Sequence, residues 1–149
     1  MAFKSQQLLR EAVISVKAKI EEVFPLLCPK KEEEWIPGWI CETIYSKSGY
    51  NEQGAVFKTT KPYGTELYWT TLEYDIKKRL VDFFIMAPGL YMLRYKIAVI
   101  SDKDSLTLTF NQLFTAVSDE GNKFLDRYRT EDFPGRIKEL ESLICKAIS

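Results

Sequence analysis

From residue 40 to residue 117, short hydrophobic runs alternate with short polar turns, and this pattern constrains the fold more than any other feature of the sequence. Turn-forming residues such as Gly54, Gly89 and the segment 61–64 separate the runs, which occupy residues 40–45, 55–60, 67–74, 80–86, 91–100 and 106–117. Each connection has few residues, whereas a crossover between parallel strands needs about a dozen. The sequence therefore predicts six consecutive strands in an antiparallel meander.

The segment before this meander predicts one more strand and two short helices. Residues 9–18 alternate between hydrophobic and polar side chains, which is typical of a strand with one buried face. Residues 21–27 and 30–35 have the character of short helices, and Pro29 and Pro37 end them because proline cannot continue a helix.

The C-terminal part changes to the spacing of an amphipathic helix. Its hydrophobic residues recur every three or four positions, at Phe133, Ile137, Leu140, Ile144 and Ile148. A shorter helical stretch surrounds Leu125. Asp132 is suited to an N-cap before Phe133-Pro134, so we expect a break near residues 130–134.

These elements predict an α+β fold in one domain over residues 1–149, with a curved seven-stranded antiparallel sheet wrapped around a long C-terminal helix and two short helices between strands one and two. Such a sheet is about 30 Å wide at a strand spacing of ~4.8 Å. A helix is only ~10–12 Å across, so it cannot cover the sheet completely. We expect a hollow between them that suits a small apolar ligand.

The absence of histidine from the chain excludes several classes of site. It removes Ser-His-Asp and Cys-His nucleophiles and the commonest metal ligand. Three cysteines, at positions 28, 41 and 145, form no Cys-x-x-Cys motif, so we expect reduced thiols in a cytoplasmic protein, without a metal or other cofactor.

The charge balance and the hydrophobic segments restrict the partners. Basic and acidic residues are equal in number, 21 each, which predicts no nucleic-acid partner. No apolar stretch approaches the ~20 residues of a membrane span, so we expect no stable membrane insertion. The N-terminus does not have the pattern of a secretory signal. We expect a monomer or a homodimer.

Three stretches resemble a known group of proteins. They are Val23-Phe24-Pro25-Leu26-Leu27-Cys28-Pro29, Glu34-Trp35-Ile36-Pro37-Gly38-Trp39 and the residues 114–122. Together with the order of elements, they are similar to a little-characterised bacterial subgroup of the START-like (SRPBCC) superfamily. This resemblance covers nearly the whole chain and implies the helix-grip fold of lipid-transfer domains and polyketide cyclases. Some of those cyclases use histidine, which this chain lacks.

Strand alternation indicates which side chains line the hollow, because charged neighbours such as Lys58, Arg94 and Glu42 mark the outer face. The inward residues predicted in this way include Tyr45, Phe57, Phe83, Tyr95, Phe110 and Gln112. Trp69 has conflicting signals, since Glu73 assigns its face to solvent and its size favours the interior.

Among these residues, the tips of Tyr45, Tyr95 and Gln112 either orient a ligand or bond neighbours in a filled core. Trp35 and Trp39 flank Pro37-Gly38, where they either form the rim of the hollow or plug the corner between helix and strand.

Phe133 and Ile137 complete the predicted ligand-binding set from the C-terminal helix. The favoured interpretation is that the protein binds a small hydrophobic molecule of lipid, polyketide or isoprenoid type. A polyketide cyclase or dehydratase is the alternative, with inward-facing Asp82 or Glu73 as general base. A protein-interaction domain is the third, with a filled interior and an exposed apolar patch.

Overall fold

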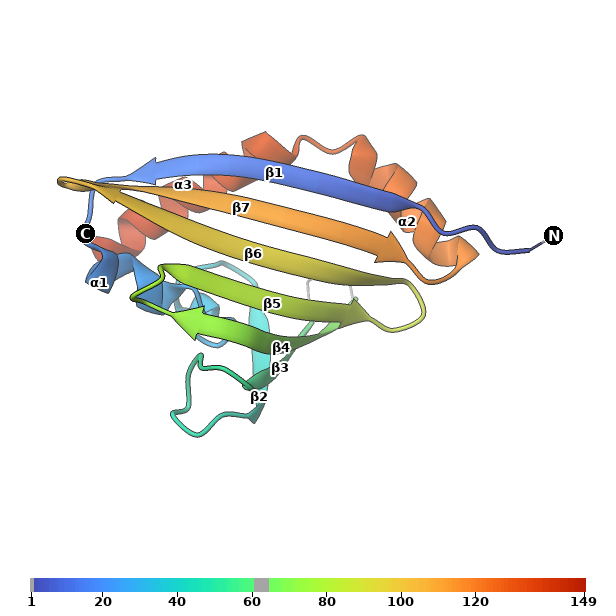
Figure 1. Cartoon of the computed structure of the whole chain (residues 1–149), viewed down its shortest axis with the longest axis horizontal. Helices are drawn as coiled ribbons and strands as arrows, with labels where there is room; N and C mark the ends of the chain where they lie inside the picture. The colour runs from blue at the N-terminus through green and yellow to red at the C-terminus, as the bar shows by residue number, and fades with distance from the viewer. Residues whose placement is uncertain (1, 61–64) are drawn as a thin grey trace.

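The computed structural model describes residues 2–60 and 65–149 of the chain (Figure 1). All seven strands form one antiparallel sheet in the order β1-β7-β6-β5-β4-β3-β2. The strands are β1 Gln7–Val16, β2 Ile40–Tyr45, β3 Val56–Thr60, β4 Glu66–Asp75, β5 Leu80–Ala87, β6 Tyr91–Asp102 and β7 Ser105–Ala116. The predicted meander is confirmed, while the turn expected at 61–64 lies outside the described residues.

The helical elements also follow the predicted order. The first short helix is α1 Ile20–Val23 continued by the 3₁₀ turn η1 Phe24–Leu26, and the second is the 3₁₀ turn η2 Lys31–Glu34. After the sheet come α2 Asp119–Arg129 and α3 Phe133–Ile148. The expected break therefore falls between Arg129 and Phe133. The Asp132 side chain caps α3 by accepting from the Gly135 amide at 3.1 Å.

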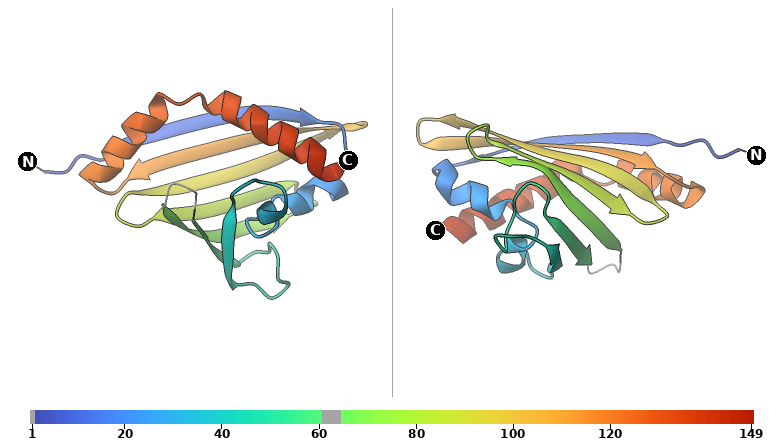
Figure 2. Two further views of the ribbon diagram at one scale, coloured as in Figure 1. Left: turned by 180° about the vertical axis from the view of Figure 1, so that it is seen from behind. Right: turned by 60° about the horizontal axis from the view of Figure 1, so that its bottom comes forward.

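The sheet curves around α2 and α3, which lie on its concave face (Figure 2). Strand β1 pairs along its whole length with β7, so the N-terminal strand lies beside the strand that leads into the helices. Helix α3 packs against β1, and η1 and η2 cover another part of the concave face (Figure 2). This is the α+β helix-grip arrangement that the sequence predicts.

The core lies between the concave face and α3, as the alternation requires. Inward residues of β7 such as Leu108 and Phe110 are at most 1% exposed, and Ile144 of α3 is completely buried. Phe57 and Phe83 are buried on neighbouring strands. Burying such side chains contributes about 1.5–3 kcal/mol each to stability, which is why the helix and the sheet hold together.

Two bulges change the alternation where the sequence gives no sign of them. In β2 the register shifts between Thr43 and Tyr45, and in β4 it shifts between Thr71 and Glu73. A bulge inserts one residue, so the side chains beyond it change face. Trp69 lies before the bulge in β4, points inward and is 5% exposed. Glu73 lies beyond the bulge and points outward.

The same effect makes the prediction for Tyr45 wrong. Strict alternation from Cys41 turns Tyr45 inward, but the bulge turns it to solvent, and it is 55% exposed. Because Tyr45 lies after the bulge, it cannot supply a polar tip to the interior.

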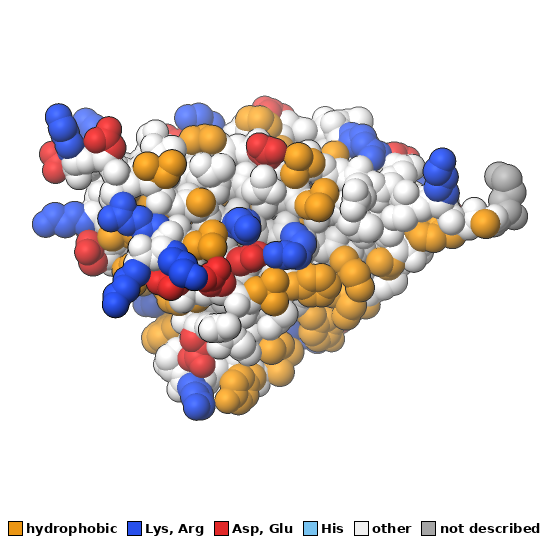
Figure 3. Space-filling view, viewed as in Figure 1, with side chains coloured by type: hydrophobic (Ala, Val, Ile, Leu, Met, Phe, Trp, Pro, Cys, Tyr) orange, Lys and Arg blue, Asp and Glu red, His pale blue; other side chains and the backbone are white. Residues whose placement is uncertain are grey.

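The convex face of the sheet carries both charged groups and apolar side chains, and many of the apolar ones gather at the lower right of the view (Figure 3). Asp82 of β5 accepts from Arg94 of β6 at 3.0 Å, and Glu73 pairs with Lys78 at 3.0 Å. Both carboxylates lie on this outer side of the sheet, as their charge predicts. Among the described residues, no helix combines the length and apolar character needed to cross a bilayer.

Gly121 provides a test of how α2 is attached to the sheet. A Cβ at this position would overlap the Leu90 carbonyl oxygen and press on Ala116. Gly121→Ala is therefore expected to lower the free energy of unfolding by about 1–3 kcal/mol, measured by urea denaturation.

Lys123→Ala is the matched control, because Lys123 lies on the same helix and its side chain is 71% exposed. We expect this change to stay within about 0.5 kcal/mol of the wild type. Equal stability of the two variants would contradict the close contact between α2 and the β5–β6 turn.

Candidate ligand-binding site

A cavity of about 280 Å³ lies between the concave face of the sheet and helix α3. Strands β4 to β7 supply most of one wall, and α2, α3, the segment from Ile36 to Trp39, Arg10 of β1 and Glu32 of η2 also line the cavity. The cavity exists because α3 packs against β1 at one edge and leaves the middle strands uncovered. Its volume is close to the lower end of the ~300–1,000 Å³ typical of small-molecule sites.

Two tryptophans form part of the apolar wall. Trp39 and Trp69 meet edge to face with ring centroids 6.2 Å apart, and Trp69 packs in the same way on Phe83 at 5.1 Å. Trp39 donates its indole N–H to the Pro29 carbonyl, and Trp69 donates to Thr59 Oγ1, each at 2.8 Å. Because these polar atoms are satisfied within the protein, the rings present apolar surface to the cavity.

Arg10 of β1 brings a positive charge to the cavity wall. Its guanidinium carbon lies 4.4 Å from the ring centre of Phe133 and 5.0 Å from those of Phe114 and Tyr128. These rings come from α3, β7 and α2, so Arg10 joins the sheet to both helices. The faces of aromatic rings attract cations, and the attraction is stronger where water is excluded. The Arg10 side chain is only 13% exposed.

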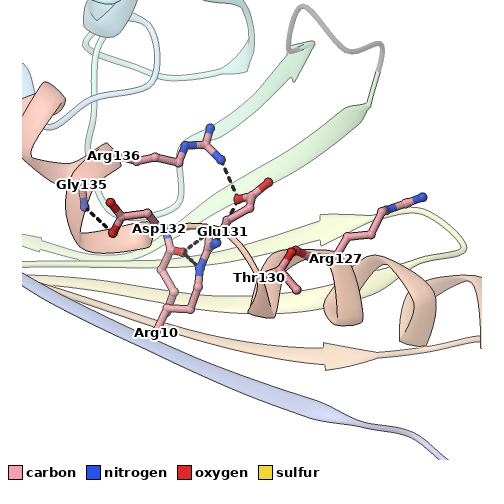
Figure 4. A network of polar contacts seen from close by, with 8 residues as sticks. Arg10, Arg127, Thr130, Glu131, Asp132, Gly135 and Arg136 are labelled. Carbon is pink, nitrogen blue, oxygen red and sulfur yellow. Dashed lines mark hydrogen bonds and ion pairs between the residues drawn. The ribbon is translucent and has the colours of Figure 1, made fainter.

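Polar contacts hold this guanidinium in place (Figure 4). Its Nη2 and Nε donate to Gln112 Oε1 at 3.0 and 3.3 Å, across the β1–β7 pair. Its Nη1 reaches Glu131 Oε2 at 3.5 Å, and Arg136 donates to that same oxygen at 2.7 Å. Burial lowers the pKa of Arg10, and Glu131 opposes this effect. Arginine nevertheless remains charged at neutral pH.

Gln112 extends the polar chain to Tyr95. Its oxygen accepts from Arg10, and its side chain also bonds the Tyr95 hydroxyl. Burial raises the pKa of Tyr95, Glu32 raises it further, and the bond to Gln112 opposes them. Tyr95 is therefore a neutral hydroxyl at physiological pH and can donate to a ligand.

Further polar groups line the cavity. Tyr91 is buried and bonds the Tyr128 hydroxyl, and burial together with Tyr128 raises the pKa of Tyr91. Glu32 of η2 also lines the cavity, near Tyr95. The lining thus combines aromatic surface with arginine, glutamate, amide and hydroxyl groups. Among the described residues, no cluster of three acidic or cysteine side chains suits a metal ion.

The structure brings half of the predicted site residues to this cavity. Trp39, Tyr95, Gln112, Phe133 and Ile137 line it. The predicted inward orientation is also right for Phe57, Phe83 and Phe110, but these rings lie in the packed core behind the wall.

The other two predicted residues lie away from the cavity. Trp35 is 9% exposed and does not line it, which fits the interpretation of this residue as a plug at the corner. Tyr45, as described above, faces solvent.

Arg10 is the main site residue that the sequence prediction missed. It shares the inward face of β1 with Ala12 and Ile14, so strict alternation would have found it. A charged side chain on an apolar face was the available signal. Glu32 and Arg136 are further cases, because each lies on a helical segment whose contact with the sheet is set by the tertiary fold.

Comparisons with known proteins agree with this architecture. No family model matches the sequence, and no curated protein matches it either. Solved structures do match over nearly the full length. A truncated norcoclaurine synthase from Thalictrum flavum has a TM-score of 0.72 at 17% identity, covering 98% of this chain and 96% of that chain.

Two other solved structures are also similar over nearly the full length. The Zhui aromatase/cyclase from Streptomyces sp. R1128 has a TM-score of 0.73 at 10% identity, covering 95% of this chain and 94% of its own. Ara h 8.0201 has a TM-score of 0.62 at 15% identity, covering 97% and 96%. The chain shares the helix-grip fold of these structures, so the predicted fold is confirmed.

The cysteines allow a test of how tightly the fold is closed. Cys28 and Cys41 are buried and Cys145 is exposed. Burial raises the pKa of Cys28, and burial together with Glu33 raises that of Cys41 to about 12. The thiolate is the reactive form, so at pH 8 we expect Ellman's reagent to titrate only Cys145 in the native protein.

In guanidinium chloride the protein unfolds, and the reagent is expected to titrate all three thiols. The Cys145→Ser variant is the control, and none of its thiols is expected to react in the native state. Rapid reaction of the buried thiols in the native protein would contradict the closed packing of η1, η2 and β2.

Proposed function

We propose that this protein binds a small hydrophobic molecule of lipid, polyketide or isoprenoid type in the cavity between the sheet and α3. The observation that carries the proposal is the composition of the wall, in which aromatic surface surrounds a few polar tips at Arg10, Gln112 and Tyr95. Apolar burial contributes about 25 cal/mol per Å², and the polar tips orient the ligand.

The size of the cavity favours a compact ligand. A volume of about 280 Å³ suits a few fused rings or a short chain better than a complete membrane lipid. A norcoclaurine synthase from Thalictrum flavum, 16% identical to this chain, forms a complex with dopamine and hydroxybenzaldehyde, two small aromatic molecules. That precedent in the same fold supports a ligand of similar size.

A second hollow of about 300 Å³ supports a route to the cavity. It lies between the start of β4 and α2, and it shares Leu67, Tyr91, Tyr128 and Arg136 with the cavity. The break between α2 and α3 adjoins it, and Glu131 lines it. In our proposal, movement of the helices about this break admits the ligand.

Acid–base catalysis is the second candidate, and Glu32 favours it. The carboxylates considered from the sequence, Asp82 and Glu73, lie on the outer side of the sheet, but Glu32 lines the cavity near Tyr95. A carboxylate beside a tyrosine suits proton abstraction in a cyclisation. A bound ligand recovered unchanged favours a carrier, whereas a change in its covalent structure that Glu32→Gln abolishes favours an enzyme.

Other features support a binding protein acting as one domain over residues 1–149. A protein-interaction module is expected to have a filled interior, and the cavity does not fit that expectation. The free cysteines support our proposal of a cytoplasmic protein. The balanced charge supports our proposal that it has no nucleic-acid partner. We also propose that it is a monomer or a homodimer. Membership of the bacterial subgroup suggested by residues 23–29, 34–39 and 114–122 stays a prediction.

A cavity-filling substitution tests the binding proposal. Ile137 of α3 lines the cavity, so the indole of Ile137→Trp would occupy ligand space. The neutral apolar probe N-phenyl-1-naphthylamine is expected to bind the wild-type protein with enhanced, blue-shifted fluorescence. The affinity of Ile137→Trp for the probe is expected to be at least about tenfold lower, equivalent to ~1.4 kcal/mol.

Ile100→Trp is the matched control, because Ile100 is 62% exposed on the convex face. It is expected to bind the probe as the wild type does. Circular dichroism checks that both variants fold. If the wild-type protein takes up no probe, or if both variants bind it equally well, the cavity is not the binding site.

A further inference from the structure

We infer that the ligand carries a carboxylate, and that this anion binds Arg10 at the junction of α2 and α3. The inference rests on the proposed function and specifies the chemistry of the ligand. It is carried by three observations: the distant and shared ionic partner of Arg10, its uncommitted hydrogen-bond donors and the enclosed position of its guanidinium.

Arg10 shares its ionic partner at the junction with a second arginine. Arg10 and Arg136 both reach a single carboxylate oxygen, Glu131 Oε2, at 3.5 and 2.7 Å. The nearby Asp132 accepts from the Gly135 amide, so its carboxylate is engaged at the start of α3 (Figure 4). The shorter distance pairs Glu131 mainly with Arg136. Glu131 is therefore a weak ionic partner for Arg10. The carboxylate of a ligand would give Arg10 a closer one.

Arg10 also has donors to offer. Its guanidinium carries five N–H groups, and the described residues accept from three of them, through Gln112 Oε1 and Glu131 Oε2. A planar guanidinium fork matches a carboxylate. Gln112 fixes one edge of the group by accepting from both Nε and Nη2, so the guanidinium is already oriented before a ligand arrives.

The surroundings of Arg10 increase the effect of such a pair. Rings of Phe114, Tyr128 and Phe133 exclude water from the guanidinium, and Arg10 lines the cavity itself. Ionic hydrogen bonds are stronger where the local dielectric is low. The ligand's apolar body would then lie against Trp39 and Trp69, which line the same cavity.

A structural role for Arg10, as a clamp between the sheet and the helices, predicts a different outcome. A clamp contributes to stability and is indifferent to the charge of the ligand. The test therefore compares two ligands that share a ring system, 2-naphthoate and its neutral isostere 2-naphthamide. Isothermal titration calorimetry measures both affinities at pH 7. We expect the wild type to bind 2-naphthoate at least about tenfold more tightly.

Two variants test whether the preference for 2-naphthoate depends on Arg10. Arg10→Met keeps much of the apolar stem and is expected to bind both ligands equally. Arg127→Met is the matched control, because Arg127 also lies over an aromatic ring, Phe124 at 4.4 Å, but does not line the cavity. It is expected to keep the wild-type preference.

Gln112→Glu keeps Arg10 and puts a carboxylate beside it, so it tests the inference even if Arg10→Met does not fold. We expect this variant to lose the preference for 2-naphthoate and to retain its affinity for 2-naphthamide. Circular dichroism and thermal unfolding check the fold of each variant.

The outcomes separate this inference from the proposed function. If the wild type binds the two ligands equally, the carboxylate inference is overturned while the binding function stands. If it binds neither, the binding function fails and the inference fails with it. A preference that persists in both Arg10→Met and Gln112→Glu would assign the anion to another group and overturn the role of Arg10.

Discussion

The geometry of a narrow helix on a broad curved sheet governs the rest of this structure. Helix α3 buries its apolar stripe near β1, and the two helices with the 3₁₀ turns cover the concave face incompletely (Figure 2). An α-helix is about 10–12 Å across, whereas seven strands span about 30 Å. The uncovered middle strands become the floor of a cavity, and the aromatic side chains of the concave face become its lining.

The polar groups in this cavity are organised by Arg10. Its guanidinium contacts Gln112 on the neighbouring strand and Glu131 between the two helices, and Gln112 passes the network on to Tyr95. Buried charges and polar groups are tolerated where partners satisfy them. The same network joins the sheet to the helices and presents hydrogen-bond donors to the cavity. The stability of the α2–α3 junction is therefore linked to the chemistry of the site.

Much of the fold could be predicted because its signals are local. Each signal spans only a few residues: the alternation in the strands, the prolines that end helices and the helical spacing after Phe133. Asp132 and Pro134 likewise predicted the break before α3. The wrong orientation predicted for Tyr45 and the conflicting signals at Trp69 have one cause. Tyr45 and Trp69 lie on strands that contain a bulge, and a bulge changes which face the following residues occupy without changing composition.

The sequence by itself determined the order of the elements, the inward faces of most strands and the aromatic character of the interior, because hydrophobic periodicity acts over short distances along the chain. Only the tertiary structure decided which inward side chains reach open space. Phe57, Phe83 and Phe110 are packed behind the wall, while Arg10, Glu32 and Arg136 converge on the cavity from segments far apart in the chain. That convergence depends on how the sheet curves and where the helices lie on it, which no local pattern specifies.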